Sequence, residues 1–422
     1  MSERRFVILG GGLAGATAAT TLREGGFDGA VTLIGQEAHP PYHRPPLSKG
    51  YLRGEEAFAD QFVVPADEYA ERGIELRLGV RALRIDPRQR FVELADRERV
   101  PYDRLLVATG GRNRRFPVPG ADLDGVLQLR TVEEADRIRV GARPGARAVL
   151  AGMGFIGSEV AASLRQLGVE VTVVEPAATP LARVLGEEVG SVMADVHRDR
   201  GVQLLLGDTI EAIEGDGRVE RVRTAGGRSL ACDIVVAGIG IAPNVELLEL
   251  AGAATENGVL VDEHCRTTLP EVFAAGDVAN HRHPVFGRIR VEHWNNAFNQ
   301  GAAAARAMLG DAAPYDYIHS FWSDQYDQKI EYVGFAASWD RVVLRGDVAG
   351  RRFLAFYLQD GVLRAAFGLD RGGDPEDTED PDGELKACVP LIRDRVPVDA
   401  DRLADEAHEV GGRVGARPPG TV

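Results

Sequence analysis

RFVILGGGLAGATAATTLREGGFDGAVTLIGQE, residues 5–37, and RAVLAGMGFIGSEVAASLRQLGVEVTVVE, residues 147–175, follow one pattern. In each, a short apolar run leads into GxGxxG, a small-residue stretch follows, and a second apolar run ends near an acid. This order is the βαβ fingerprint of a dinucleotide-binding domain. One GxGxxG alone is a weak signal, but two copies with the same flanking runs predict two such domains in one chain.

The six glycines of the two motifs have different tasks. The first allows the tight turn out of the strand, the second lets the backbone approach a pyrophosphate, and the third lets helix and strand pack closely. The pyrophosphate is expected at the positive N-terminus of the helix. In this order, the glycines are Gly10, Gly12 and Gly15 in the first copy and Gly152, Gly154 and Gly157 in the second.

The acid that ends the second apolar run indicates which nucleotide binds. In the second copy this acid is Glu175, whose carboxylate can accept hydrogen bonds from both ribose hydroxyls and would repel a 2′-phosphate. No arginine follows it directly, so NADH is favoured over NADPH. In the first copy the run ends at Gln36 and Glu37, and either side chain is a candidate for the adenosine ribose of a second nucleotide.

Composition sets the broad class. The chain has 422 residues, a net charge of −15, and a 44% hydrophobic and 27% charged composition, which is typical of a globular protein with several domains. The acidic balance argues against sequence-independent nucleic-acid binding. The apolar run at residues 6–9 is too short for a signal-peptide core, and no uncharged apolar stretch approaches 18 residues. A cytoplasmic protein without a membrane span is expected.

Three later segments suggest that one of the two nucleotides is a flavin. YDRLLVATGG, residues 102–111, and DIVVAGIGIAPN, residues 233–244, are apolar runs that end in small residues and can pass close to a cofactor. TTLPEVFAAGDVA, residues 267–279, places Asp277 just after a predicted strand, where its carboxylate would suit a ribityl hydroxyl. The alternative for Asp277 is a simple helix cap.

Eight motifs together resemble the FAD- and NADH-dependent ferredoxin reductases, of the putidaredoxin-reductase-like and rubredoxin-reductase-like kind. They are GGGLAG, PYHRPPLSK, ATGG, GMGFIGSE, GIGIAPN, AAGDVA, VEHWNNAFNQG and FWSDQY, and the resemblance covers about residues 4–370. It implies a glutathione-reductase-like α/β architecture with two Rossmann-like domains and a C-terminal α+β interface domain. The implied segments are 1–108 and 236–315 for FAD, 109–235 for NAD, and 316–422 for the interface domain with a disordered tail.

The resemblance also implies roles for individual residues. The family usually has an acid where this chain has Gln36, and it would place Trp322 near the flavin, although a tryptophan in an apolar segment is as often simple core. Trp339 is expected in the core. The implied FAD contacts are Leu13, Ala14, Gly15, Lys49, Ala82, Arg130, Asp277 and Trp294, and the implied NADH contacts are Gly154, Ile156, Gly157, Glu175 and Gly240.

Lys49 is unusual because the chain contains only two other lysines, Lys329 and Lys386, among many arginines. This indicates a position that suits a compact ammonium group better than a planar guanidinium. In the family the lysine lies beside the flavin and pairs with the glutamate of GFIGSE, here Glu159, so both residues are predicted to act in catalysis. The alternatives are a solvated surface lysine and a solvent-exposed helix-face carboxylate.

The resemblance implies transfer of hydride from NADH to FAD, and then of single electrons to a two-iron ferredoxin that supplies a haem monooxygenase or a ring-hydroxylating oxygenase. Disulfide reductases of this architecture have cysteines after the first βαβ unit, but residues 38–60 contain none, and Cys232, Cys265 and Cys388 are far apart. Electrons should therefore leave the flavin for an outside acceptor. The alternatives are a small-molecule acceptor and a redox-sensing role like that of apoptosis-inducing factor. No metal site is predicted, and a monomer and a weak homodimer both fit.

The region after Gly368 departs from the family. Residues 374–384 hold seven acids and no basic residue, which is typical of a solvated loop. Ferredoxins are commonly acidic, so docking needs a locally basic face. The arginine-rich stretches at residues 111–116 and 340–352 are the candidates, and the final residues GGRVGARPPGTV are expected to be disordered.

Overall fold

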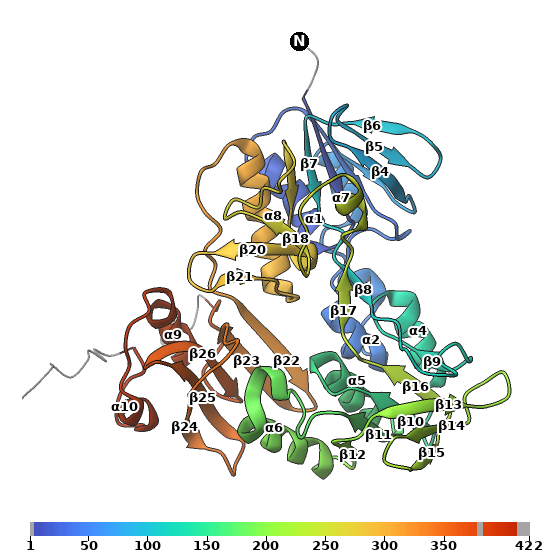
Figure 1. Cartoon of the computed structure of the whole chain (residues 1–422), viewed down its shortest axis with the longest axis vertical. Helices are drawn as coiled ribbons and strands as arrows, with labels where there is room; N and C mark the ends of the chain where they lie inside the picture. The colour runs from blue at the N-terminus through green and yellow to red at the C-terminus, as the bar shows by residue number, and fades with distance from the viewer. Residues whose placement is uncertain (1–3, 378–382, 412–422) are drawn as a thin grey trace, which may run out of the picture. The chain divides into compact units, whose positions relative to one another are not determined.

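The computed structural model describes residues 4–377 and 383–411, and it divides into two compact units, each built from separate stretches of chain (Figure 1). The first unit comprises Met1–Arg44, Phe58–Arg112 and Ile241–Tyr317. The second comprises Pro45–Ala57, Asn113–Gly240 and Ile318–Val422. Of the predicted tail, residues 411–422, all but Gly411 lie outside the described residues.

The first unit is organised around a five-stranded parallel sheet with the order β19-β7-β1-β2-β3. Helix α1 connects β1 to β2 and packs against α8, so the first sequence copy forms the expected βαβ unit. Phe6 stacks on Phe27 within the core between sheet and helices. The elements are β1 (Arg5–Leu9), α1 (Leu13–Glu24), β2 (Ala30–Ile34), β3 (Ile74–Arg77), β7 (Arg104–Val107), β19 (Val272–Ala274) and α8 (Trp294–Leu309).

Smaller elements complete the first unit. An antiparallel sheet has the order β4-β5-β6, and a second small sheet has the order β18-β20-β21. The elements are η2 (Phe58–Gln61), α3 (Ala66–Glu71), β4 (Ala82–Asp86), β5 (Phe91–Leu94), β6 (Arg99–Pro101), α7 (Glu246–Leu250), β18 (Val259–Val261), η3 (Gly276–Val278), β20 (Ala279–His283) and β21 (Gly287–Ile289). The chain passes between the units through β8 (Gly111–Asn113) and β17 (Ile241–Pro243), which pair with each other.

The second unit contains a second parallel sheet, with the order β12-β11-β10-β16-β9, in which α5 connects β10 to β11. An antiparallel sheet β13-β14-β15 lies beyond β12 in the sequence. The elements are η1 (Pro45–Ser48), α2 (Gly50–Arg53), β9 (Val126–Leu127), α4 (Val132–Gly141), β10 (Arg147–Ala151), α5 (Phe155–Gln166), β11 (Glu170–Glu175), α6 (Ala182–Asp199), β12 (Gln203–Leu206), β13 (Ile210–Glu214), β14 (Arg221–Thr224), β15 (Ser229–Ala231) and β16 (Ile234–Ala237).

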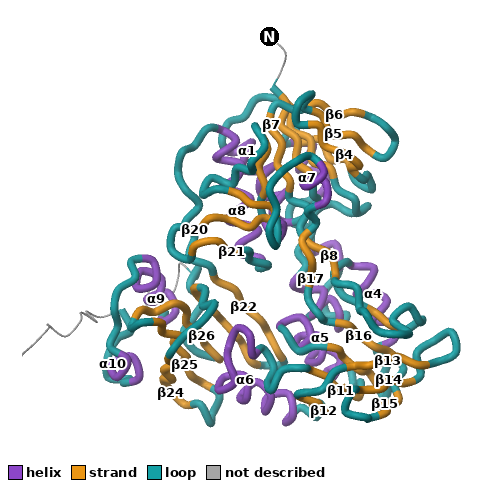
Figure 2. The backbone as a smooth tube through the Cα atoms, viewed as in Figure 1, coloured by secondary structure: helices purple, strands orange, loops and turns teal. Residues whose placement is uncertain are grey.

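The C-terminal part of the second unit is an antiparallel sheet, β22-β23-β26-β25-β24, drawn in orange in Figure 2. Its core includes Phe353, Tyr357 and Phe367, and Trp339 packs against this cluster as the sequence predicts. The elements are β22 (Ser320–Gln325), β23 (Gln328–Gly334), β24 (Arg341–Asp347), β25 (Arg352–Gln359), β26 (Val362–Leu369), α9 (Glu384–Arg393) and α10 (Ala400–Ala404).

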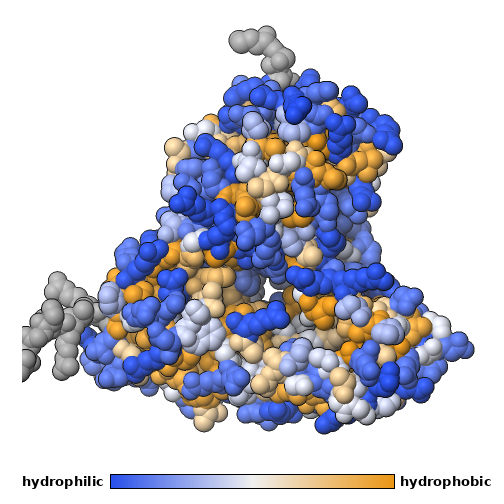
Figure 3. Space-filling view, viewed as in Figure 1, coloured by the Kyte–Doolittle hydropathy of each residue, from blue (hydrophilic) through white to orange (hydrophobic). Residues whose placement is uncertain are grey.

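Two parallel sheets with βαβ units and an antiparallel C-terminal sheet confirm the predicted fold class. The predicted division at residues 108, 235 and 315 stays a prediction. On the face drawn in Figure 3, hydrophilic residues form much of the outer surface of each unit, with hydrophobic residues scattered among them. In the described part of the chain, no helix combines the length and the apolar character that crossing a membrane requires.

Candidate functional site

The first glycine-rich loop leads from β1 into α1. Gly10 has a φ of +123°, and a Cβ at this residue would lie 2.1 Å from the carbonyl oxygen of Ala108, the residue that follows β7. Only glycine therefore fits at this position. Gly12 is the N-cap of α1 and brings no side chain to its first N–H groups, and the space beside it is open. This arrangement fits a pyrophosphate, whose oxygens can accept from those N–H groups.

The second loop, between β10 and α5, repeats this geometry. Gly152 has a φ of +92°, and a Cβ there would lie 2.6 Å from the carbonyl oxygen of Gly238. Gly154 is the N-cap of α5, again with no side-chain cap and with open space beside it. The second unit thus has its own anion-binding helix N-terminus, and the residues at both loops fit the predicted dinucleotides.

Glu175, the last residue of β11, points back toward the second loop. Its Oε2 accepts a hydrogen bond of 2.6 Å from the N–H of Met153, and its Oε1 accepts one of 2.8 Å from the N–H of Ala177. These two bonds fix the carboxylate beside the loop and leave further acceptor capacity on both oxygens. The position is the one from which a carboxylate meets a ribose in this fold.

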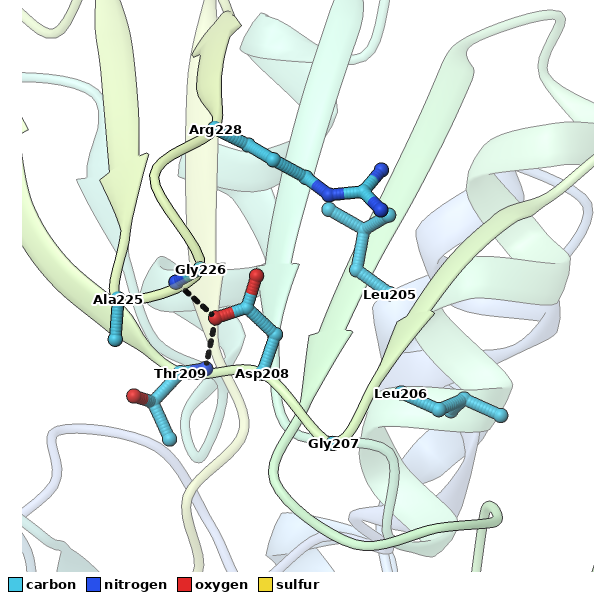
Figure 4. A pocket seen from close by; sticks show the side chains of 8 residues that line it. All are labelled: Leu205, Leu206, Gly207, Asp208, Thr209, Ala225, Gly226 and Arg228. Carbon is cyan, nitrogen blue, oxygen red and sulfur yellow. Dashed lines mark hydrogen bonds between the residues drawn. The ribbon is translucent and has the colours of Figure 1, made fainter.

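An open pocket of about 480 Å³ is lined by residues 205–209, 225, 226 and 228 (Figure 4). The N–H of Asp208, in its lining, donates to the Glu175 carbonyl oxygen at 3.3 Å. The Asp208 carboxylate accepts from the N–H groups of Thr209 and Gly226 at 2.8 and 2.9 Å. Hydrogen bonds from the Thr224 side chain and from these backbone groups lower the pKa of Asp208. No predicted site residue lines this pocket, and sequence reasoning did not single out Asp208.

The two candidates at the end of β2 differ in their surroundings. Gln36 is exposed. The Glu37 carboxylate accepts from the Arg44 guanidinium and from the Tyr42 hydroxyl, each at 2.5 Å. Tyr42 and Arg44 lie in the PYHRPPLSK motif but were not predicted as site residues. Which of Gln36 and Glu37 meets a ribose remains open.

Lys49 and Glu159 form the ion pair that the resemblance implies, with 2.9 Å between Nζ and Oε2. The Lys49 side chain is only 13% exposed and the Glu159 side chain 4%, so the alternatives of a solvated lysine and an exposed carboxylate are wrong. Two serines complete the carboxylate's contacts. Ser48 donates its hydroxyl to Oε2, and Ser323 on β22 donates to Oε1 at 2.6 Å.

In the first unit, Trp294 begins α8, and its indole N–H donates to Nδ1 of His43 at 2.9 Å. Burial lowers the pKa of His43, which keeps this nitrogen available as an acceptor. The indole also stacks on Phe298, with the rings 5.3 Å apart and 7° from parallel. Asp277 is half-buried in η3, directly after β19, as the sequence predicts.

The remaining predicted residues occupy both units. Leu13, Ala14 and Gly15 form the first turn of α1, and Ala82 begins β4, all in the first unit. The structure thus brings together Lys49 with Glu159, and Glu175 with the second loop, while the cofactor contacts themselves stay predictions. The predicted residues in the second unit, besides the loop glycines, are Lys49, Arg130, Ile156, Glu159, Glu175, Gly240 and Trp322; Ile156 and Gly240 are exposed, and Trp322 is half-buried on β22.

All three cysteines are buried free thiols. Burial raises the pKa of Cys232 and of Cys265 to about 12, so neither is a reactive thiolate. This agrees with the expectation that the flavin passes electrons outward without a thiol relay.

One expectation about the C-terminal region needs correction. The acidic stretch is not a loop throughout, because Glu384 begins α9 and its carboxylate accepts from Arg345 at 2.8 Å and Arg371 at 2.7 Å. Residues 378–382 of that stretch lie outside the described residues. Arg345, in the second predicted docking stretch, is 5% exposed and also donates to the carbonyl oxygens of residues 403, 405 and 408, so it holds the fold together.

Sequence reasoning missed Ser48, Ser323 and His43 as site residues. The two serines stand beside predicted residues, since Ser48 precedes Lys49 and Ser323 follows Trp322, whereas His43 lies in the PYHRPPLSK motif without a predicted neighbour. A position beside a predicted residue was the available signal, but it does not show which buried group the serine hydroxyl contacts.

The chain matches two family models: pyridine nucleotide-disulphide oxidoreductase over residues 4–301, and reductase C-terminal over residues 320–411. It is 40% identical over 403 residues to the 5,5'-dehydrodivanillate O-demethylase ferredoxin reductase subunit of Sphingobium sp., covering 94% of this chain and 95% of the relative. It is 41% identical over 382 residues to the anthranilate 1,2-dioxygenase system ferredoxin–NAD(+) reductase component of Burkholderia cepacia, covering 89% and 93%.

Among solved structures, the chain resembles the covalent putidaredoxin reductase–putidaredoxin complex, with a TM-score of 0.90 and 34% identity over 96% of each chain. The chain therefore belongs to the pyridine nucleotide-disulphide oxidoreductase family. Within that family it is a ferredoxin reductase that uses FAD and a nicotinamide nucleotide. This confirms the predicted resemblance, enzyme class, cofactors and route of electrons to a ferredoxin.

Proposed function

We propose that NADH, rather than NADPH, is the donor, and that the acceptor is a two-iron ferredoxin that supplies a haem monooxygenase or a ring-hydroxylating oxygenase. The observation that carries the choice of donor is the Glu175 carboxylate, fixed at the end of β11 by the N–H groups of Met153 and Ala177. A negative charge in this position repels a 2′-phosphate and favours two free ribose hydroxyls.

The chain's own groups bind and orient the nucleotides. The first turns of α1 and α5 offer N–H groups to the two pyrophosphates, and Glu175 holds the NADH ribose. FAD held at the first loop would supply the hydride-accepting and single-electron chemistry, which no side chain supplies. Lys49 and Glu159 place a balanced charge pair in a buried position of the second unit. We assign no general base, because the reaction requires none.

The relatives support a ferredoxin as the acceptor. The Sphingobium and Burkholderia proteins are named as ferredoxin reductases of oxygenase systems, and the solved complex joins its reductase to putidaredoxin. Exposed Arg112, Arg114 and Arg115 remain available from the first docking stretch, although Arg112 also pairs with Glu246 at 2.5 Å. For the chain itself we propose a cytoplasmic location, in keeping with its free thiols, and either a monomer or a weak homodimer.

The test is NADH-driven reduction of cytochrome c by the purified protein, with and without an added two-iron ferredoxin. We expect ferredoxin to increase the rate strongly, and NADPH to be a poor donor. Ferredoxin without the reductase is the control. If NADH reduces the flavin but no two-iron ferredoxin raises the rate, the proposed partner is wrong, and a small-molecule acceptor or a redox-sensing role replaces it.

A further inference from the structure

The Glu159 carboxylate is the end of a line of buried polar side chains in the second unit. Ser323 Oγ lies 2.6 Å from Glu159 Oε1, and Gln325 Nε2 lies 3.3 Å from Ser323 Oγ. On the other side of Gln325, its Oε1 lies 3.0 Å from Nε2 of His197, and His197 Nδ1 lies 3.1 Å from the Tyr326 hydroxyl. Four hydrogen bonds therefore connect Tyr326 to Glu159.

Chemistry fixes the direction of every bond in this line. An ionised carboxylate only accepts, so Ser323 must donate to Glu159, and its oxygen can then accept from the Gln325 amide N–H. This orients the Gln325 carbonyl oxygen toward His197, which must donate from Nε2. The remaining ring nitrogen, Nδ1, accepts from Tyr326. All four donors thus point toward Glu159.

The side chains that form this line of hydrogen bonds are buried. Ser323, Gln325 and His197 are each fully buried, and Glu159 is 3% exposed, so water cannot easily replace a lost partner. Burial also lowers the pKa of His197 to about 4. The ring is therefore neutral at pH 7 and must choose one nitrogen for its proton.

The line joins parts of the chain that are distant in sequence. Ser323 and Gln325 are two residues apart on β22, so their side chains share one face of the strand. His197 comes from α6 and Glu159 from α5. Lys49 and Ser48, on the segment before α2, hold the other carboxylate oxygen, so Glu159 is held from two opposite directions.

We propose that Ser323, Gln325 and His197 are positioning residues for Glu159, and that they hold its carboxylate ionised and oriented through a one-way hydrogen-bond chain. Without the hydrogen bond from Ser323 to Oε1, only Ser48 and Lys49 would hold the Glu159 carboxylate, which would then turn toward them. The inference rests on the predicted catalytic role of Glu159, which pairs with Lys49. Its tests do not involve ferredoxin, so they can fail independently of the proposed acceptor.

The first test reads the tautomer of His197 by ¹⁵N NMR of the FAD-loaded protein, with the signal assigned from a His197→Gln sample. We expect the proton on Nε2 and none on Nδ1. A proton on Nδ1, or on both nitrogens, at pH 7 would contradict the proposed direction. This measurement needs no variant that alters Glu159.

Glu159→Gln should reverse the chain. Lys49 and Ser48 are donors, so the new amide oxygen faces them and its NH₂ group faces Ser323, which must then donate toward Gln325. The Gln325 amide turns over, and the His197 proton moves to Nδ1. In Glu159→Gln with Gln325→Leu the link is cut, and the tautomer should match that of Gln325→Leu alone. An unchanged tautomer in Glu159→Gln would overturn the coupling.

The second test asks whether Ser323 acts through Glu159. Ser323→Ala should lower the limiting rate of flavin reduction by NADH about tenfold, as expected for loss of a hydrogen bond to a charged group, and Ser323→Thr should restore it. The affinity for NAD⁺, measured by calorimetry, gives a second readout. Ser320→Ala, a buried serine on the same strand that bonds to Glu376, is the matched control.

A double-mutant cycle makes the second test decisive. In a Glu159→Ala background, Ser323→Ala should change neither the reduction rate nor the NAD⁺ affinity, because its target is gone. If the serine substitution costs the same with and without Glu159, the effect is structural and the positioning role is wrong.

Discussion

We predict that a single carboxylate decides which nicotinamide nucleotide the second loop accepts. Glu175 is held by two backbone N–H groups at the end of β11, so its charge stays where a 2′-phosphate would arrive. Glu175→Ala should lower the preference for NADH over NADPH by about tenfold, because a charge-assisted contact is lost and a repulsion removed. The ratio of kcat/KM for the two nucleotides measures this. Exposed Glu170, at the start of the same strand, provides Glu170→Ala as the control, and an unchanged ratio would remove Glu175 from the ribose site.

Substitution of Asp277 provides the corresponding test for FAD binding. It is half-buried directly after β19, where we predict a contact with the ribityl chain. Asp277→Ala should be purified with less FAD per protein, as measured by the ratio of flavin to protein absorbance. Asp311→Ala, at an exposed position of the same unit, should keep full occupancy, and full occupancy in Asp277→Ala would count against the contact.

At the residue scale, the sequence allowed prediction of groups whose partners have a fixed motif context. Lys49 and Glu159 are such a pair, and the structure has their ion pair. The hydrogen bonds to Glu159 from Ser48 and Ser323, and the bond from Trp294 to His43, could not be predicted, because they join residues 111, 164 and 251 positions apart. Such contacts depend on tertiary packing that no local pattern specifies.

At the scale of elements, different glycines of each loop serve the fold and the ligand. One is required by the backbone conformation, and another leaves room for the nucleotide. Gly152 has a positive φ and no space for a Cβ, whereas Gly154 has an ordinary φ of −74° and open space beside it. Gly152→Ala should lower the free energy of unfolding by more than about 1 kcal/mol, because alanine is strained in that conformation.

Gly154→Ala should leave the stability nearly unchanged but raise the KM for NADH, since its methyl group occupies the place of the pyrophosphate. Urea unfolding and steady-state kinetics on both variants measure the two effects. Equal loss of stability in both, or normal NADH binding by Gly154→Ala, would contradict this division of tasks.

The elements also show where pattern reasoning reached its limit. The two βαβ units could be predicted because the glycine spacing and the apolar runs are local properties of the chain. The charge of the acidic run at residues 374–384 predicts a solvated loop, but Glu384 starts α9 and bonds to Arg345 and Arg371. Composition does not reveal that an acid has buried basic partners elsewhere.

For the whole molecule, buried histidines predict a pH-dependent stability. Burial lowers the pKa of His197 and of His283 to about 4, and that of His281 to about 3, whereas the pKa of a histidine in the unfolded chain is near its ordinary value of 6.5. The unfolded state therefore binds protons more readily, so stability is full above about pH 6.5 and falls as the pH drops toward 4. Each histidine should cost about 2 kcal/mol between pH 7 and pH 5.

Urea unfolding at pH 7, 6 and 5 measures this loss. His197→Gln keeps an N–H donor toward Gln325 but cannot be protonated, so its stability should fall less steeply with pH than that of the unmodified protein. Parallel slopes for His197→Gln and the unmodified protein would contradict the assignment.

The ion pair and hydrogen bonds that hold the Glu159 carboxylate limit which parts of the chain can be exchanged on their own. The carboxylate lies on α5, between residues 113 and 240, but its partners come from the segment that contains Ser48 and Lys49 and from β22. A chimaera that transfers only residues 113–240 into a reductase without counterparts of Ser48, Lys49 and Ser323 would import a buried charge without the groups that balance it, at a cost of several kcal/mol. Successful chimaeras should therefore exchange three pieces of chain together: residues 113–240, the segment that contains Ser48 and Lys49, and β22. The NADH-binding module is thus made of segments that are not continuous in the sequence.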